Sequence, residues 1–266
     1  MQVFFLEENL KSNFFKRLFK RVEIIDDRII LNCTEKNLCN KKNVYKITNH
    51  IKRFESSYLV ISKSLKINKS FINLLESNNL KIANGKKLFK IKLYNILDEI
   101  CKKYSLNKKA SRISILANNY DLELNSFINL VINEYKSINI VTNHYNLFEN
   151  LQKNILNKYG SILYITNNKK KALCNSNIII NIDFPQELIN KYFIYDNSII
   201  LNVEEKVKIN KKRFQGKIIN DYNVSIKNDL ESKLKLERLK NYDLKDILEC
   251  YIICNIDAQK DIVINI

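Results

Sequence analysis

At 266 residues, with 45% hydrophobic and 27% charged residues, the chain has the composition of a globular protein of one or two domains. Its apolar runs fall short of the roughly 20 residues that span a bilayer, and its six scattered cysteines are typical of reduced thiols rather than of a secreted disulfide scaffold, so we expect a cytoplasmic protein that does not cross a membrane. The formal net charge of +17 leaves nucleic acid open as a partner, because clustered Lys and Arg gain affinity by releasing counterions from phosphates.

The first hundred residues alternate short β-branched runs with helical patterns. Strands are predicted over 3–6, 22–31 and 58–61, the second as a hairpin about Asp26-Asp27. Apolar residues recur at helical spacing over 11–20, 69–78 and 88–104, which predicts three helices. Asn84-Gly85 lies between two short apolar runs and predicts a tight turn, because both residues tolerate a positive φ. We therefore expect a smaller α/β lobe over residues 1–105.

The second half of the chain has a more regular pattern. Apolar strand-like runs recur over 113–116, 138–141, 162–165, 178–180 and 199–201, with helical patterns over 122–135, 147–159 and 186–192 between them. Near-continuous Ile/Val/Leu strands that alternate with helices indicate a parallel sheet covered on both faces. The predicted fold class is therefore α/β, with a Rossmann-like domain over 106–225. A helical segment over 226–266, with apolar residues Leu230, Leu234, Leu236, Leu239 and Leu244, is expected to pack back on one lobe.

Residues 137–203 carry a more specific pattern. A first strand with a polar end, Ile138-Asn139-Ile140-Val141-Thr142-Asn143, is followed by the predicted helix over 147–159. A second strand with a polar end, Ile162-Leu163-Tyr164-Ile165-Thr166-Asn167-Asn168, is followed by Lys169-Lys170-Lys171-Ala172. A later strand, Ile178-Ile179-Ile180-Asn181-Ile182-Asp183, is followed by Phe184-Pro185. This arrangement resembles the dinucleotide-binding domain of the shikimate dehydrogenase and glutamyl-tRNA reductase families. The resemblance makes 138–141 the first strand, 162–165 the second, and residues 142–147 the phosphate-binding turn.

The resemblance implies a nicotinamide cofactor, but the turn lacks the residues that such a cofactor needs. Glycines let backbone amides approach the pyrophosphate at the helix N-terminus, whereas residues 142–147 contain none, and neither does the earlier turn over 117–121. We therefore expect a degenerate site and no conventional cofactor. NADP stays as an alternative, because the resemblance places Lys169, Lys170 and Lys171 near a 2′-phosphate, beside the polar candidates Asn143, Asn167 and Asn168.

Few residues suggest catalysis. Of the two histidines, His144 follows a predicted parallel strand, at the edge where open α/β sheets bind ligands; a hydrogen-bonding loop residue is the alternative. Asp183 ends another strand and has the same two interpretations, catalysis or capping of the next helix. Cys250 and Cys254 are four residues apart, but a zinc site needs two more ligands, so no metal is expected.

These observations favour a non-catalytic Rossmann-like protein with a small-ligand or scaffold role. One alternative is an NADP-dependent oxidoreductase of the shikimate dehydrogenase type. A second is a nucleic-acid-binding protein with a Lys-rich face, although only seven of the 45 basic residues are arginine, the residue whose planar fork best grips phosphates and bases. The three glycines and one proline, beside many Asn and Ile, also match A/T-rich codon usage, which by itself raises the lysine content.

Overall fold

The computed structural model describes residues 3–9, 12, 14–32, 37–54, 57–204, 206–226, 234, 236–254 and 261–266. The chain divides into two compact units, the first comprising Met1–Leu88 with Ile226–Val263 and the second Phe89–Ser225 with Ile264–Ile266. The expected segments 1–105, 106–225 and 226–266 stay a prediction about independently folding domains. The predicted apolar residue Leu230 lies outside the described residues. Within the described ranges, the helices are too short or too polar to cross a membrane.

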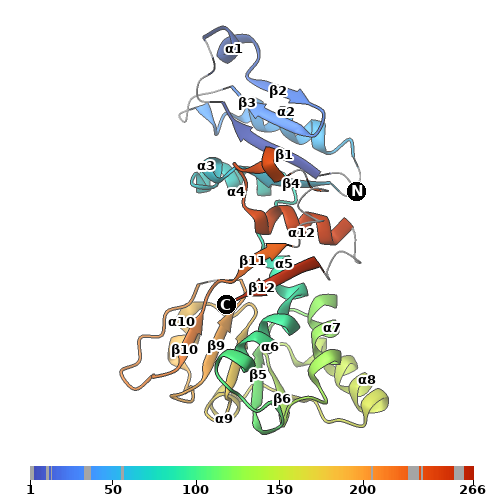
Figure 1. Ribbon diagram of the computed structural model, residues 1–266, viewed down its shortest axis with the longest axis vertical. Helices are drawn as coiled ribbons and strands as arrows, with labels where there is room; N and C mark the ends of the chain where they lie inside the picture. The colour runs from blue at the N-terminus through green and yellow to red at the C-terminus, as the bar shows by residue number, and fades with distance from the viewer. Residues whose placement is uncertain are drawn as a thin grey trace. The chain divides into compact units, whose positions relative to one another are not determined.

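The first unit contains a four-stranded sheet in the order β2-β3-β1-β4 (Figure 1). Its strands are β1 (Val3–Glu8), β2 (Val22–Ile25), β3 (Arg28–Leu31) and β4 (Tyr58–Ile61). β1 is parallel to β3 and β4, whereas β2 and β3 form the expected antiparallel hairpin. Asp26 takes a positive φ of 54° at its turn, a conformation that Asp tolerates better than most residues.

Helices cover both faces of this sheet, because side chains alternate along a strand. They are α2 (Lys41–Ile51), α3 (Lys63–Lys66), α4 (Lys69–Ser77) and α12 (Leu244–Cys254). The short helix α1 (Phe14–Phe19) follows β1 in the chain, and its Phe15 and Phe19 are exposed. Phe4 and Leu6 of β1 share a core with α2, α3 and α4. Val3 and Phe5 point the other way and pack in a second cluster with Ile247 of α12.

The second unit contains six parallel strands in the order β10-β9-β8-β5-β6-β7. They are β5 (Arg112–Leu116), β6 (Ser137–Val141), β7 (Tyr164–Thr166), β8 (Ile178–Asn181), β9 (Ile199–Asn202) and β10 (Lys217–Ile219). The α/β Rossmann-like class expected from the alternating runs is confirmed. A separate sheet pairs β11 (Asn223–Ile226) with β12 (Ile262–Asn265).

The connections in the second unit run over opposite faces of the six-stranded sheet. The helices after its strands are α7 (Leu122–Val131), α8 (Glu149–Tyr159), α9 (Lys169–Leu173) and α10 (Gln186–Lys191). The chain moves one way from β5 to β7 and the other way from β7 to β10, so right-handed crossovers put α7 and α8 on one face and α9 and α10 on the other. Accordingly, Leu116, Val141 and Ile179 pack with residues of α9 and α10.

One expected helix is interrupted. The pattern over 88–104 forms two helices, α5 (Lys86–Ile91) and α6 (Leu93–Lys103), separated at Lys92. Gly85 takes a positive φ of 76°, as expected for the Asn84-Gly85 turn, and α5 begins directly after it, two residues before the expected helix start. The carboxylate of Glu249, in α12, accepts hydrogen bonds from the backbone N–H groups of Lys87 and Leu88. This capping of α5 comes from a residue distant in sequence, which local periodicity does not reveal.

Candidate functional site at the carboxyl edge of the parallel sheet

The strand order locates the ligand-binding edge of the second unit. Counted along the chain, its strands lie in the order sixth, fifth, fourth, first, second, third, which is the Rossmann arrangement. The topological switch point, where such sheets bind ligands, therefore lies between β5 and β8. The first turn of the Rossmann unit is 117–121, after β5.

This order corrects the alignment implied by the resemblance. The strand over 138–141, expected to be the first, is β6 and therefore the second, and the strand expected over 162–165 is β7, the third. The apolar runs of β5 and β6 look alike in sequence, and only their pairing partners distinguish them. The turn over 142–147 is therefore not the first turn of the Rossmann unit.

The amides of the first turn are bound by a carboxylate of the protein itself. Asn118 N lies 2.8 Å from Oδ1 and 3.0 Å from Oδ2 of Asp183, and Asn119 donates to Oδ2 through N and Nδ2, both at 2.9 Å. Asp183 follows β8, the neighbour of β5 across the switch point. It does not cap its own helix, because the N-cap of α10 is Pro185. Backbone amides at this turn are the groups that hold the pyrophosphate of a dinucleotide.

The helix that follows the first turn is tied to a second charged group. Asp121 caps α7 by accepting a 2.8 Å hydrogen bond from Leu124 N. Its carboxylate also lies 2.9 Å from Lys90 Nζ, which is 3.1 Å from Glu204, a residue that follows β9. Burial lowers the pKa of Lys90, but the two carboxylates outweigh burial and the net shift is upward. Lys90 thus joins the carboxyl ends of β5 and β9.

The turn after β6 is connected to the first turn and to α9. Asn143 N donates a 3.0 Å hydrogen bond to Asn118 Oδ1, and Asn143 Oδ1 accepts a 2.5 Å hydrogen bond from Lys169 Nζ. His144 is exposed, and its backbone N donates to Thr142 Oγ1 at 3.0 Å. The structure therefore brings Asn143, Lys169 and Asp183 into one hydrogen-bonded series through Asn118.

The remaining candidates have separate surroundings. Asn167 is exposed and accepts a hydrogen bond from Lys169 N through its carbonyl oxygen. Asn168 caps α9 by accepting from Lys171 N at 3.0 Å. Lys170 lies 5.1 Å from the centre of the Phe193 ring, and Lys171 lines a groove on the α9 face of the sheet. The three consecutive lysines thus point to three different environments rather than to one phosphate.

A dinucleotide pyrophosphate does not fit the first turn of this structure. The Asp183 carboxylate already accepts the hydrogen bonds of Asn118 N and Asn119 N, and a second anion there would be repelled by it. The turn also lacks glycine, so Cβ atoms flank the amides. No step of a hydride-transfer reaction is therefore derived for this site.

A partly buried ionic cluster in the first unit was missed by sequence reasoning. Lys66, at the end of α3, pairs with Asp243 at 2.6 Å and with Asp246 of α12. Burial raises the pKa of Asp246 to about 6, although Lys66 opposes this shift. Lys66 and Asp243 are 177 residues apart, and no local sequence signal connects them.

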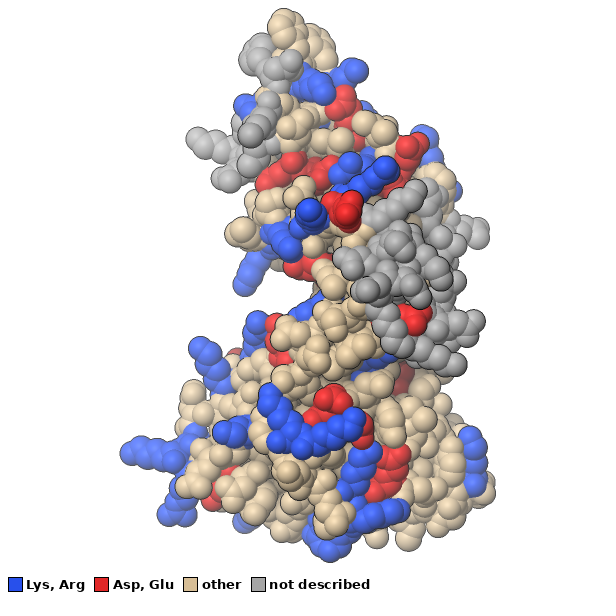
Figure 2. All heavy atoms as spheres, in the orientation of Figure 1, with Lys and Arg blue, Asp and Glu red and all other residues tan. Residues whose placement is uncertain are grey.

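On the face that Figure 2 presents, Asp and Glu side chains lie among the more abundant Lys and Arg side chains in both units. Among the described residues, no group of three or more His, Cys, Asp or Glu is placed to hold a metal ion.

Comparisons with known proteins found similar solved structures but no similar sequence. No family model and no curated protein matches the chain. L-tryptophan dehydrogenase from Nostoc punctiforme is 6% identical with a TM-score of 0.40, over 84% of this chain and 65% of that one. Ornithine carbamoyltransferase from Pyrococcus furiosus is 8% identical with a TM-score of 0.33, over 83% and 75%. A shikimate dehydrogenase in complex with NADP+ is 13% identical with a TM-score of 0.36, over 96% of both chains. These values carry no argument about activity, and the Rossmann assignment rests on the strand order of this chain.

Proposed function

We propose that this chain is a Rossmann-type small-ligand-binding or scaffold protein that does not use a dinucleotide cofactor. The observation that carries the proposal is the position of the Asp183 carboxylate on the amides of the first turn. The Lys90 ion pairs and the hydrogen bonds of Asn143 support it, because these polar groups at the edge already have internal partners. A dinucleotide would have to replace several of these interactions, which is costly for partly buried charges.

Isothermal titration of the full chain with NAD+ and NADP+ tests the proposal. We expect no saturable binding of NAD+ by the wild-type protein at millimolar concentration. Asp183→Ala frees the two amides, so sulfate should raise the melting temperature of this variant more than that of the wild type at equal ionic strength. Glu187→Ala, which removes an exposed carboxylate from α10, is the charge-matched control. Micromolar affinity for NAD+ in the wild type would overturn the proposal.

One observation favours the alternative of an NADP-linked oxidoreductase. Lys169 contacts Asn143 at the end of the second strand, which is the position where dinucleotide-binding domains recognise the ribose or its 2′-phosphate. This alternative requires Asp183 to leave the first turn when the cofactor binds. It predicts that Lys169→Gln weakens NADP+ binding and leaves NAD+ binding unchanged. The nucleic-acid alternative expects a contiguous basic face, and on the face drawn in Figure 2 acidic side chains interrupt the basic ones.

A further inference from the structure

A groove lies on the α9 face of the six-stranded sheet, in the second unit. Its volume is about 540 Å³, within the range of roughly 300–1,000 Å³ common for small-molecule sites. Three cations line it, namely Arg112, Lys136 and Lys171, together with Asn139 and Asn175 and the ring of Tyr164. No carboxylate is among the described residues that line it.

The groove exists because α9 is too short to cover the strands beneath it. The helix has five residues, and its Ala172 and Leu173 pack against Leu116 and Val141 near the carboxyl ends of β5 and β6. Side chains two residues apart on a strand share a face, so Ser114 and Asn139 continue the same face toward the strand starts. The face changes there from apolar to polar.

Strand register aligns the polar side chains in rows. Arg112 pairs with Ser137, and Ser114 pairs with Asn139, which in turn pairs with Tyr164. Asn139 Nδ2 donates to Ser114 Oγ at 3.3 Å. Because this hydrogen bond restrains Asn139, the floor of the groove is organised before any ligand binds.

Among the described residues, none that lines the groove is acidic. Arg112, Lys136 and Lys171 form no ion pair with the residues that the structure describes. Glu134 lies close in sequence, but its carboxylate accepts a 2.8 Å hydrogen bond from Lys108 and a 2.9 Å hydrogen bond from Tyr94.

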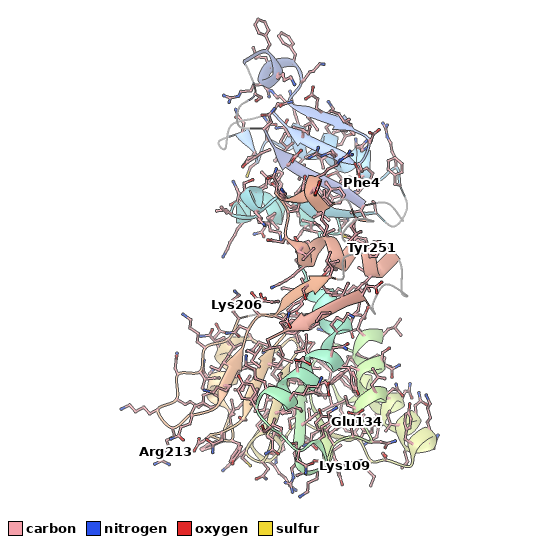
Figure 3. All side chains as sticks on the ribbon, in the orientation of Figure 1. Phe4, Lys109, Glu134, Lys206, Arg213 and Tyr251 are labelled. Carbon is pink, nitrogen blue, oxygen red and sulfur yellow. The ribbon has the colours of Figure 1, made fainter. Side chains whose placement is uncertain are left out.

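Figure 3 labels Lys109 and Glu134 at the end of the unit where β5 and β6 begin. Arg112 is the first residue of β5. Arg112 is partly exposed and lines the groove, so its guanidinium can meet an anion that enters there.

We propose that this groove binds a phosphomonoester that carries a flat ring, with a mononucleotide as the representative ligand. A guanidinium recognises a phosphate through two parallel hydrogen bonds, and lysines add charge. Tyr164 is 53% exposed, and an exposed aromatic side chain can stack on a nucleobase. The proposal rests on the small-ligand role proposed above and names the ligand class.

Calorimetric titration of the full chain with AMP, adenosine and inorganic phosphate tests the groove. AMP should bind, and Arg112→Gln should weaken its affinity at least about tenfold, the loss expected for one charge-assisted hydrogen-bonded pair. Tyr164→Leu should weaken AMP and leave phosphate unchanged. Lys153→Gln removes an exposed lysine from α8, which covers the opposite face, and should leave AMP affinity unchanged. Lys171→Gln gives an independent test if Arg112→Gln alters the far-ultraviolet circular dichroism spectrum.

The outcomes separate this inference from the proposed function. Three results would each overturn the inference. They are absence of AMP binding at millimolar concentration, equal affinity for AMP and adenosine, and an AMP affinity that none of the groove variants changes. Binding of phosphate as tight as that of AMP would also overturn it, because the ring would then add nothing. NADP+ has a phosphomonoester of its own, so NADP+ binding that Arg112→Gln abolishes supports the groove. Binding of NAD+ would instead contradict the proposed function and leave the AMP result unaffected.

Discussion

Asp246 should make the stability of the first unit depend on pH in a direction opposite to that of an ordinary ion-paired carboxylate. Its side chain is 2% exposed, and burial raises its pKa from 3.8 to about 6. The native state therefore binds a proton that the unfolded state releases between about pH 4 and pH 6, so stability falls as the pH rises through this window. A shift of about two units at 1.36 kcal/mol per unit corresponds to about 3 kcal/mol.

Asp246→Asn isolates this contribution, because asparagine resembles the protonated acid in shape and cannot ionise. Urea unfolding of wild type and variant should give similar free energies near pH 4. The variant should be more stable by about 3 kcal/mol at pH 7, where the native aspartate carries its full desolvation cost. Lys66→Met, which removes the cation beside Asp246, should move the wild-type step to higher pH. A difference between wild type and Asp246→Asn that is constant from pH 4 to 7, or that changes in the opposite direction, would refute the reasoning.

Four further substitutions should change the stability of the second unit, each measured by urea unfolding at pH 7. Asp183→Ala leaves two backbone amides of the first turn without their acceptor and should cost about 2 kcal/mol, after allowance for partial exposure; an unchanged midpoint would contradict the bonds described. Lys90→Met leaves two carboxylates without their cation and should cost about 2–3 kcal/mol, and equal stability of variant and wild type would argue against the ion pairs. Gly216→Ala places a methyl group against the Ser198 carbonyl oxygen and should cost more than about 3 kcal/mol. Gly160→Ala, in open space at φ of 64°, should cost only about 1 kcal/mol. The reverse ranking would show that the backbone around Ser198 moves to accommodate the methyl group.

Local sequence pattern predicted the elements that depend on local chemistry. The hairpin about Asp26-Asp27, the strand over 58–61 and the helix from residue 122 lie where expected. The strand expected over 162–165 begins later, at Tyr164, because Ile162 is 60% exposed and pairing with β6 starts only at Tyr164. The interruption at Lys92, between α5 and α6, was also missed. The first amides of α5 are bound by Glu249, which is distant in sequence, so local periodicity does not show where α5 begins and ends.

The candidate site was predictable in part. Asn143, His144 and Asp183 were expected at the carboxyl ends of parallel strands, and the structure places all three at that edge. Which strand is first was not predictable, because apolar runs of equal length carry no information on their neighbours. The bond between Asp183 and the turn over 117–121 follows only from the pairing of β5 with β8. The groove on the α9 face could not be predicted for a similar reason, since Arg112 and Tyr164 line one groove only because β5, β6 and β7 lie side by side in the sheet.

The sequence by itself determined the alternation of strands and helices, the parallel α/β class of the second half and the absence of glycine from the turns over 117–121 and 142–147, because periodicity and residue type act over a few neighbouring positions. Only the tertiary structure decided that β5 leads the Rossmann unit, that Asp183 occupies its first turn and that Asp246 is buried beside Lys66. These facts depend on contacts between residues far apart in the chain. Such contacts are selected by the packing of whole strands and helices, which no short stretch of sequence encodes.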